Sequence, residues 1–256
     1  MIPAISPQNE SERLEVLKSY NILDSLPEEE YDAITKIASG ICNTSIALVS
    51  IVDEDRQWFK SKHGLDATET PRDLAFCAHS ILNPKELFII NDATKDERFH
   101  DNPLTTEAPN VVFYAGAPLN SSEGFPLGTL CVIDNKPKVL NETQKESLLL
   151  LAEQVVRLLE LRKKNRELKE SKEKFEKLNE QLNNFAYRLT HDLKSPINGV
   201  SFLLDVLKED HLDLYKNTEA EGYIDLISNR IVYMNNLVTE ILNYSKVTSE
   251  NIMYEN

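Results

Sequence analysis

The stretch IALVSIVDEDRQWFKSKHG (residues 46–64) contains two strand signals separated by a short polar turn. Residues 46–53 form a continuous apolar run rich in β-branched side chains, which is typical of a buried strand. Residues 57–64 alternate polar and apolar side chains, as a partner strand does. Because the EDR sequence between them is a plausible turn, the stretch predicts two adjacent strands of an antiparallel sheet.

The residues on either side extend this pair into a mixed domain. Apolar side chains at helical intervals predict helices before the pair, over 11–23 and 28–42, and after it, over 142–162. Three further strands are expected at 88–92, 111–120 and 125–134, with SSEG (121–124) as the turn of a hairpin. The predicted fold class is α+β, an antiparallel sheet flanked by helices.

Length and composition limit the classes of function that the chain can have. The length of 256 residues favours two domains. The formal net charge of −14 argues against non-specific nucleic-acid binding, which requires clustered positive charge. The three cysteines have neither CxxC nor paired spacing, so no metal site or disulfide framework is expected.

The sequence also bounds the location of the protein. Residues 1–15 have neither the basic start nor the apolar core of a signal peptide. The longest apolar runs fall far short of the roughly 20 residues that a membrane-spanning helix needs. We therefore expect a cytoplasmic protein without a membrane span.

Five blocks of the first part carry a family resemblance. They are ALVSIVDEDRQWFKSKHGL (47–65), ETPRDLAFCAHSIL (69–82), DATKDERFHDNP (92–103), FYAGAPL (113–119) and LGTLCVID (127–134). In this order and spacing, residues 9–160 resemble a GAF domain, a sensory or dimerising module of bacterial sensor kinases and cyclic-dinucleotide enzymes. The fold alone does not identify its ligand.

The composition changes after residue 160. Charged residues of both signs interleave in RKKNRELKESKEKFEKL (162–178), which favours a solvated helix face. Apolar residues recur in steps of seven through this region, which predicts a coiled coil between helices. The positions are Leu161, Leu168, Phe175, Leu182 and Leu189, with Leu178 and Phe185 at the second heptad position. A second copy of the chain is the expected partner; a single helix packed on its own GAF domain is the alternative.

The stripe continues into FAYRLTHDLKSPINGV (185–200). His191 follows Leu189 by two residues, about 200° around a helix with 3.6 residues per turn, and so lies on the solvent side. Ser195 is one turn away on the same face. Pro196 cannot donate a hydrogen bond to the carbonyl of Asp192, so a bend is expected there.

A second amphipathic helix is predicted over residues 219–247. Its apolar residues recur in steps of three and four, at Ile224, Ile227, Ile231, Met234, Val238 and Ile241. It matches residues 180–208 in length, so the two form a helical hairpin. Two hairpins from a homodimer would form a four-helix bundle.

Residues 185–200 resemble the phosphoacceptor box of two-component sensor histidine kinases, and residues 181–248 their dimerisation and phosphoacceptor (HisKA) hairpin. The resemblance implies that His191 is phosphorylated and that Asp192 orients its ring and takes its proton. Lys194 would supply positive charge near the phosphoryl group. Ser195 stands where many members have Thr or Asn to position a water for dephosphorylation, so phosphatase activity is in question. An ordinary surface histidine is the alternative for His191 alone.

The resemblance also implies partners. A histidine kinase needs an ATP-binding domain, but the sequence contains neither GxG nor a Walker motif. We therefore expect no cofactor in this chain and no autophosphorylation by it alone; ATP and Mg²⁺ would come with a catalytic domain acting in cis or in trans. The acceptor would be an aspartate of a response-regulator receiver domain. The alternative is a non-catalytic, dimerising GAF regulator that pairs with a kinase or binds a response regulator.

Five residues are weak candidates for a GAF ligand pocket: Phe76, Cys77, His79, Phe113 and Tyr114. Cysteine and strand aromatics are usually core residues, so no cofactor is assigned from them. The predicted organisation is a tail (1–8), the GAF domain (9–160), a coiled-coil linker (161–180), the HisKA hairpin (181–248) and a second tail (249–256).

Overall fold

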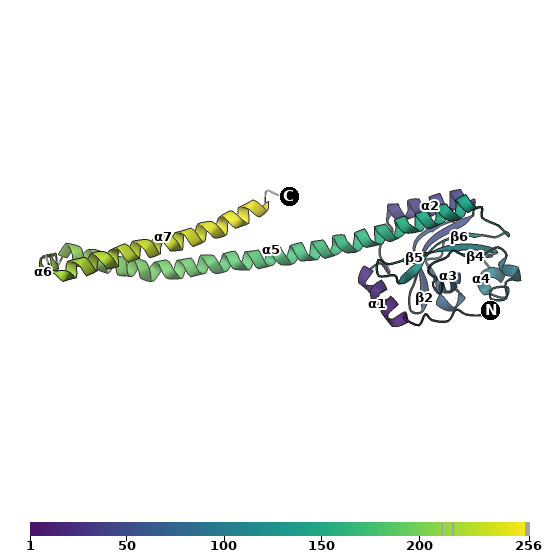
Figure 1. Ribbon diagram of the computed structural model, residues 1–256, viewed down its shortest axis with the longest axis horizontal. Helices are drawn as coiled ribbons and strands as arrows, with labels where there is room; N and C mark the ends of the chain where they lie inside the picture. The colour runs from purple at the N-terminus through teal and green to yellow at the C-terminus, as the bar shows by residue number, and fades with distance from the viewer. Residues whose placement is uncertain (211, 217, 254–256) are drawn as a thin grey trace. The chain divides into compact units, whose positions relative to one another are not determined.

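The computed structural model describes residues 1–210, 212–216 and 218–253 (Figure 1). Its contacts divide the chain into two units, Met1–Glu167 and the residues from Leu168 on. The first unit contains α1 (Glu10–Tyr20), α2 (Glu29–Cys42), β1 (Ile46–Val52), β2 (Arg56–His63), β3 (Glu69–Pro71), η1 (Arg72–Leu74), α3 (Phe76–Ser80), β4 (Phe88–Ile90), η2 (Ala93–Lys95), α4 (Pro103–Thr106), β5 (Phe113–Asn120) and β6 (Pro126–Asp134). Helix α5 (Glu142–Asp210) begins in this unit and continues into the second, which also holds α6 (Leu212–Tyr215) and α7 (Glu219–Met253).

The six strands form one antiparallel sheet in the order β3-β2-β1-β6-β5-β4. The two strands predicted from residues 46–64 pair as expected, with Ile51 opposite Trp58. The predicted hairpin joins β5 to β6, and Gly124 in its turn has a φ of 86°, a conformation that favours glycine. The α+β fold is therefore confirmed.

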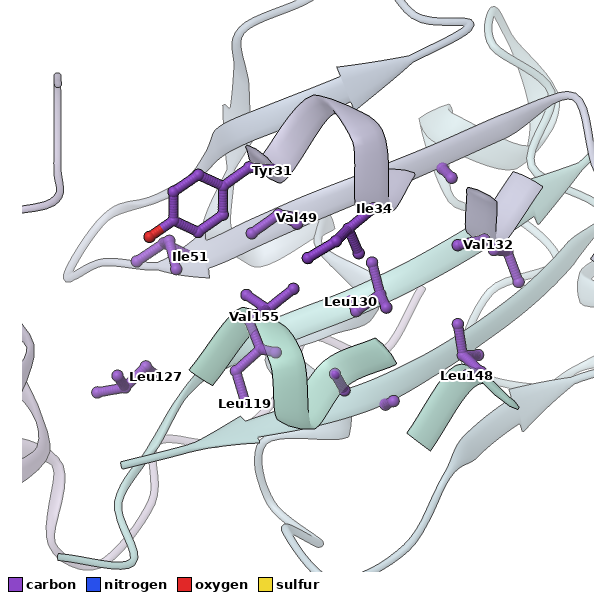
Figure 2. Packing of buried hydrophobic residues seen from close by; sticks show 14 of the residues in the cluster. Tyr31, Ile34, Val49, Ile51, Leu119, Leu127, Leu130, Val132, Leu148 and Val155 are labelled. Carbon is purple, nitrogen blue, oxygen red and sulfur yellow. The ribbon is translucent and has the colours of Figure 1, made fainter. Parts of the chain in front are cut away.

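Each face of the sheet carries a separate hydrophobic cluster. On one face, α1, α2 and the start of α5 cover residues such as Val49, Leu130 and Val132, and Figure 2 shows Tyr31 and Val155 packed over them. On the other face, α3 and the segment around α4 cover Leu48, Tyr114 and Ile133. Successive strand residues point to opposite faces, so one strand contributes side chains to both clusters.

Several boundaries differ from the sequence-based predictions. The first helix ends at Tyr20 rather than residue 23, because Asn21 adopts a left-handed conformation with a φ of 48° and caps the helix. Strand β3 and helices α3 and α4 were not predicted; they have three to five residues each, too few for a periodic signal. At the other end α7 continues to Met253, where a tail was expected from residue 249, and residues 254–256 lie outside the described residues.

The second unit is helical. Helix α5 continues without interruption past Pro196, and an ion pair of 2.9 Å between Lys208 and Asp225 joins it to α7. The side chains of Ile224, Ile231 and Val238 are buried. These observations confirm the predicted helical hairpin.

Gly128 makes the centre of the sheet sensitive to substitution. A Cβ at this position would lie 1.9 Å from the Ser50 carbonyl oxygen, in the paired strand β1. Overpacking of this kind costs about 3 kcal/mol or more when the neighbour is backbone. We expect Gly128→Ala to lower the free energy of unfolding by about this amount in urea titrations followed through Trp58 fluorescence. Gly40→Ala is the control: no atom lies within 4 Å of its Cβ, so this variant should be as stable as the wild type or slightly more stable.

Candidate functional site

His191 is presented to solvent by α5. Its side chain is 75% exposed and that of Asp192 is 77% exposed, as the position opposite the apolar stripe predicts. The neighbouring Thr190 is buried, and its hydroxyl donates to the Ala186 carbonyl at 2.8 Å, within the same helix. The helix therefore fixes the backbone of His191 while leaving its ring accessible.

Asp192 contacts one nitrogen of the His191 ring. Its Oδ1 lies 3.2 Å from His191 Nδ1. An ionised carboxylate can only accept a hydrogen bond, so Nδ1 carries the proton when the ring is neutral, and Nε2 keeps its lone pair. Because both side chains are largely in water, this contact contributes little to stability. In this contact Nε2 is the ring nitrogen that carries the free lone pair.

The other two predicted residues follow this pair on the same helix. Lys194 is partly exposed and Ser195 is exposed. Among the described residues, neither side chain has a hydrogen bond or ion pair to the His191 ring. Both are free to meet a group that approaches from solvent, so their predicted roles remain predictions.

Two apolar stripes run along helices α5 and α7. The heptad residues of α5 expose 44% to 69% of their surface: Leu161, Leu168, Phe175, Leu178, Leu182, Phe185 and Leu189. On α7, Ile224, Ile231 and Val238 are buried, whereas Ile227, Met234 and Ile241 expose 40% or more. One apolar face of α7 thus divides into a row that packs within the hairpin and a row that does not.

The first unit contains a cavity of about 380 Å³ on the α3 side of the sheet. Of the five candidate residues, Phe76, Cys77 and Tyr114 line it. Phe113 lies in the cluster on the opposite face, because it precedes Tyr114 on β5 and therefore points the other way. His79 is also outside the lining: its Nε2 donates to the Ile2 carbonyl at 3.1 Å, in the segment expected to be a tail.

The polar atoms around Cys77 and His79 explain their positions. Thr129 Oγ1 donates to Cys77 Sγ at 2.9 Å, and the Tyr114 hydroxyl lies 3.1 Å from the same sulfur. Burial, followed by the positive charge of Arg98, lowers the pKa of His79.

Two polar residues of the cavity, Gln57 and Thr70, were not predicted from the sequence. Polar residues in a half-buried strand pattern are normally assigned to the solvent face.

Two absences hold for the part of the chain that the structure describes. No group of three or more His, Cys, Asp or Glu side chains is placed to hold a metal ion. No described helix is long and apolar enough to cross a membrane.

Comparison with known families agrees with both units. The model of the GAF domain matches residues 26–159, more than half of the chain, and the chain belongs to this family. The model of the His Kinase A (phospho-acceptor) domain matches residues 181–250. An N-terminal GAF domain followed by a HisKA region makes the chain a sensor and phosphoacceptor protein of the histidine-kinase type, acting in signal transduction.

Individual relatives are similar to part of the chain. A cyclic di-GMP phosphodiesterase of Pseudomonas aeruginosa is 44% identical over 132 residues, 52% of this chain and 22% of that protein. The phytochrome-like protein Cph1 of Synechocystis is 31% identical over 105 residues, 41% of this chain and 14% of that protein. The solved GAF domain from Acinetobacter phosphoenolpyruvate-protein phosphotransferase is 16% identical, with a TM-score of 0.43 over 60% of this chain and 94% of that one. The chain spans less than a quarter of either curated relative.

Proposed function

We propose that this chain is the sensory and phosphoacceptor part of a cytoplasmic two-component histidine kinase, and that His191 accepts a phosphoryl group and passes it on. The observation that carries the proposal is the exposed His191 ring with Asp192 Oδ1 on its Nδ1 at 3.2 Å, within residues that match the HisKA model. The donor is ATP held with Mg²⁺ by a catalytic domain acting in cis or in trans. The acceptor is an aspartate of a response-regulator receiver domain.

The chemistry follows from the protonation pattern. The lone pair of Nε2 attacks the γ-phosphorus, and a P–N bond forms as the P–O bond to ADP breaks. The ring then carries a positive charge with its proton on Nδ1, and Asp192 stabilises this charge and accepts the proton. Lys194 lies three residues after His191 and supplies positive charge toward the phosphoryl oxygens. In the second step the P–N bond breaks as the receiver carboxylate takes the phosphoryl group.

Phosphorylation in trans tests this proposal. The full chain is mixed with the separately made ATP-binding domain of a related kinase and γ-labelled ATP. We expect label on this chain that is lost in acid and stable in alkali, and that moves to a receiver domain added later. If no label forms with several such donor domains, the non-catalytic regulator becomes the better reading, and binding of an unphosphorylated receiver would be its positive sign.

We further propose that the phosphoacceptor unit works as a homodimer. The heptad row of α5 and the row Ile227, Met234 and Ile241 of α7 remain exposed in the single chain. Fully burying one such side chain stabilises an assembly by about 1.5–3 kcal/mol, so a second copy that covers both rows is strongly favoured. The four helices would then form one bundle.

A charge placed in the heptad row should separate the copies. We expect the wild type to sediment at twice its chain mass of 29.2 kDa, and the double variant Leu182→Glu, Phe185→Glu to sediment as a monomer at micromolar concentration. Tyr187→Glu is the matched control, since Tyr187 is 65% exposed but lies outside both heptad positions, and should remain dimeric. A double variant that remains dimeric would exclude this seam as the interface.

A further inference from the structure

The cavity of the GAF domain has an apolar floor and an open rim. Four strands supply the floor, with Leu48 from β1, Phe59 from β2, Tyr114 from β5 and Ile133 from β6. Phe76 and Cys77 of α3 form one wall. The rest of the lining includes residues 64–67 with Leu104, Ala108, Pro109 and Val111; of these, Asp66, Ala67 and Ala108 are exposed and form part of the rim. At about 380 Å³ the cavity is in the range of small-molecule sites.

Two polar side chains in this cavity have unmet hydrogen-bonding capacity. Gln57 on β2 and Thr70 on β3 are directly opposite each other in the antiparallel ladder, and both line the cavity. Gln57 is only 5% exposed. Its Oε1 and the Thr70 Oγ1 are buried and bond to no group of the described chain. Buried polar groups are normally paired, because leaving one unpaired costs its full desolvation energy.

The charge of the lining restricts what could pair with them. Asp66 is the one charged residue of the lining, which among the described residues contains no Lys, Arg or His. Lys62 lies outside it, with its ammonium bound to the Asp66 carbonyl. A phosphate or carboxylate in this cavity would lose its water without gaining a cation. The site therefore disfavours nucleotides and other anions.

We propose that this cavity binds a small, uncharged, largely apolar molecule, of about one or two fused rings, that carries a hydrogen-bond donor for Gln57 Oε1 and Thr70 Oγ1. The apolar floor supplies the contact area. The two unpaired oxygens, Gln57 Oε1 and Thr70 Oγ1, select for a ligand that carries the donor. A site built around an unpaired acceptor rejects the analogue that lacks the donor, because the acceptor then stays unpaired. This inference goes beyond the proposed function: it concerns the first unit alone and does not depend on His191.

Matched probes test the proposal with the full chain. Indole and phenol are titrated beside 1-methylindole and anisole, which keep the ring and lack the donor, with AMP as the anionic comparison. Binding is followed by ligand-observed NMR and calorimetry. We expect indole or phenol to bind at least about tenfold more tightly than its methylated partner, and AMP not to compete.

Variants assign the binding to the cavity. Gln57→Met keeps the side-chain length without the amide, and Thr70→Val removes the hydroxyl; either should reduce the preference for the donor-bearing probe. Ala67→Trp at the exposed rim should block all probes. Ser80→Ala is the control, because the Ser80 hydroxyl is also buried and unpaired but lies outside the lining. Urea unfolding curves establish that each variant is folded.

Three results would overturn the proposal. The first is that neither indole nor phenol binds the folded wild type up to millimolar concentration. The second is equal affinity for the methylated and unmethylated probes. The third is AMP binding more tightly than either donor-bearing probe. None of these results affects phosphorylation of His191, which is measured separately in His191→Gln, a variant whose cavity is unchanged.

Discussion

Replacing His191 by glutamine is expected to abolish the acid-labile label that forms in trans, to below about one part in a thousand of the wild-type rate, since no nucleophilic nitrogen remains. Glutamine has similar length and polarity, and the side chain it replaces is 75% exposed. Substitutions at such sites usually change stability by less than about 0.5 kcal/mol, so the loss of label would report chemistry rather than folding. Label retained by the glutamine variant would place the acceptor elsewhere.

Asp192→Asn separates the role of charge from that of geometry. Asparagine can still accept a hydrogen bond from Nδ1 through its own Oδ1, but it cannot take the proton or balance the positive ring. General-base assistance contributes typically about 10²- to 10⁴-fold, so we expect the initial rate of labelling to fall by about this factor. A rate within twofold of the wild type would exclude Asp192 as the base.

Ser195→Ala is the matched control for both variants. Ser195 is on the same helical face and is exposed, yet it has no hydrogen bond to the His191 ring among the described residues. Label formation should be unchanged, while hydrolysis of the labelled partner receiver can be followed in the same reaction. Slower labelling in this variant would assign Ser195 a part in the first step.

The helical unit was largely predictable because its signals are periodic. Heptad spacing predicted α5 and its exposed row, and steps of three and four predicted α7. The pattern could not separate Ile231, which is buried, from Met234, which is exposed. Both lie on the same broad apolar face, and only the position of the neighbouring helix distinguishes them.

The cavity was less predictable because it is assembled from segments far apart in sequence. Tyr114 and Cys77 were named as candidates, but Phe113 was named with them, because an apolar run gives no sign of which face each residue occupies. The register of β2 with β3 brings Gln57 opposite Thr70. No local pattern predicts β3, which has three residues, so this polar pair could not have been found from the sequence.

A second substitution with a large expected effect, on stability, is that of Arg13. The sequence places this charged residue on a helix, and the structure buries its side chain completely. Its side chain is 0% exposed and forms a bidentate pair with Glu10, with both distances 2.7 Å. It also donates to the carbonyls of Val52 at 2.8 Å and Pro126 at 3.3 Å. This one guanidinium therefore ties α1 to the ends of two central strands.

We expect Arg13→Met to lower the free energy of unfolding of the GAF domain by about 3–5 kcal/mol. The substitution leaves the Val52 and Pro126 carbonyls without this donor and leaves Glu10 with Arg72 as its remaining partner, at 2.6 Å. Methionine fills a similar volume, so the loss reports the lost bonds rather than a cavity. Arg56→Met is the matched control. Arg56 also binds carboxylates, those of Asp24 and Glu69 at 2.6 Å, but its side chain is 30% exposed and those of its partners are 65% and 48% exposed. These pairs lie at the surface and should contribute only about 0–1 kcal/mol. Equal losses in the two variants would contradict this account.

The free energy of unfolding of wild type and of Arg13→Met should differ by an amount that depends on pH. This dependence shows whether the loss of stability comes from the pair with Glu10. Burial raises the pKa of Glu10, but the hydrogen bonds and charges of Arg13 and Arg72 outweigh it and hold that pKa below the ordinary value of 4.5. A carboxylate with a lowered folded-state pKa contributes stability that is present above the unfolded pKa and is lost as the pH falls through the folded one. The wild type should therefore lose this contribution on acidification below about pH 4.5, whereas Arg13→Met has already lost the part that Arg13 supplies and keeps the part that Arg72 supplies. Urea titrations between pH 7 and pH 3 should show the gap between the two proteins narrowing at the acid end; a constant gap would mean that Arg13 acts through packing and its carbonyl bonds, not through Glu10.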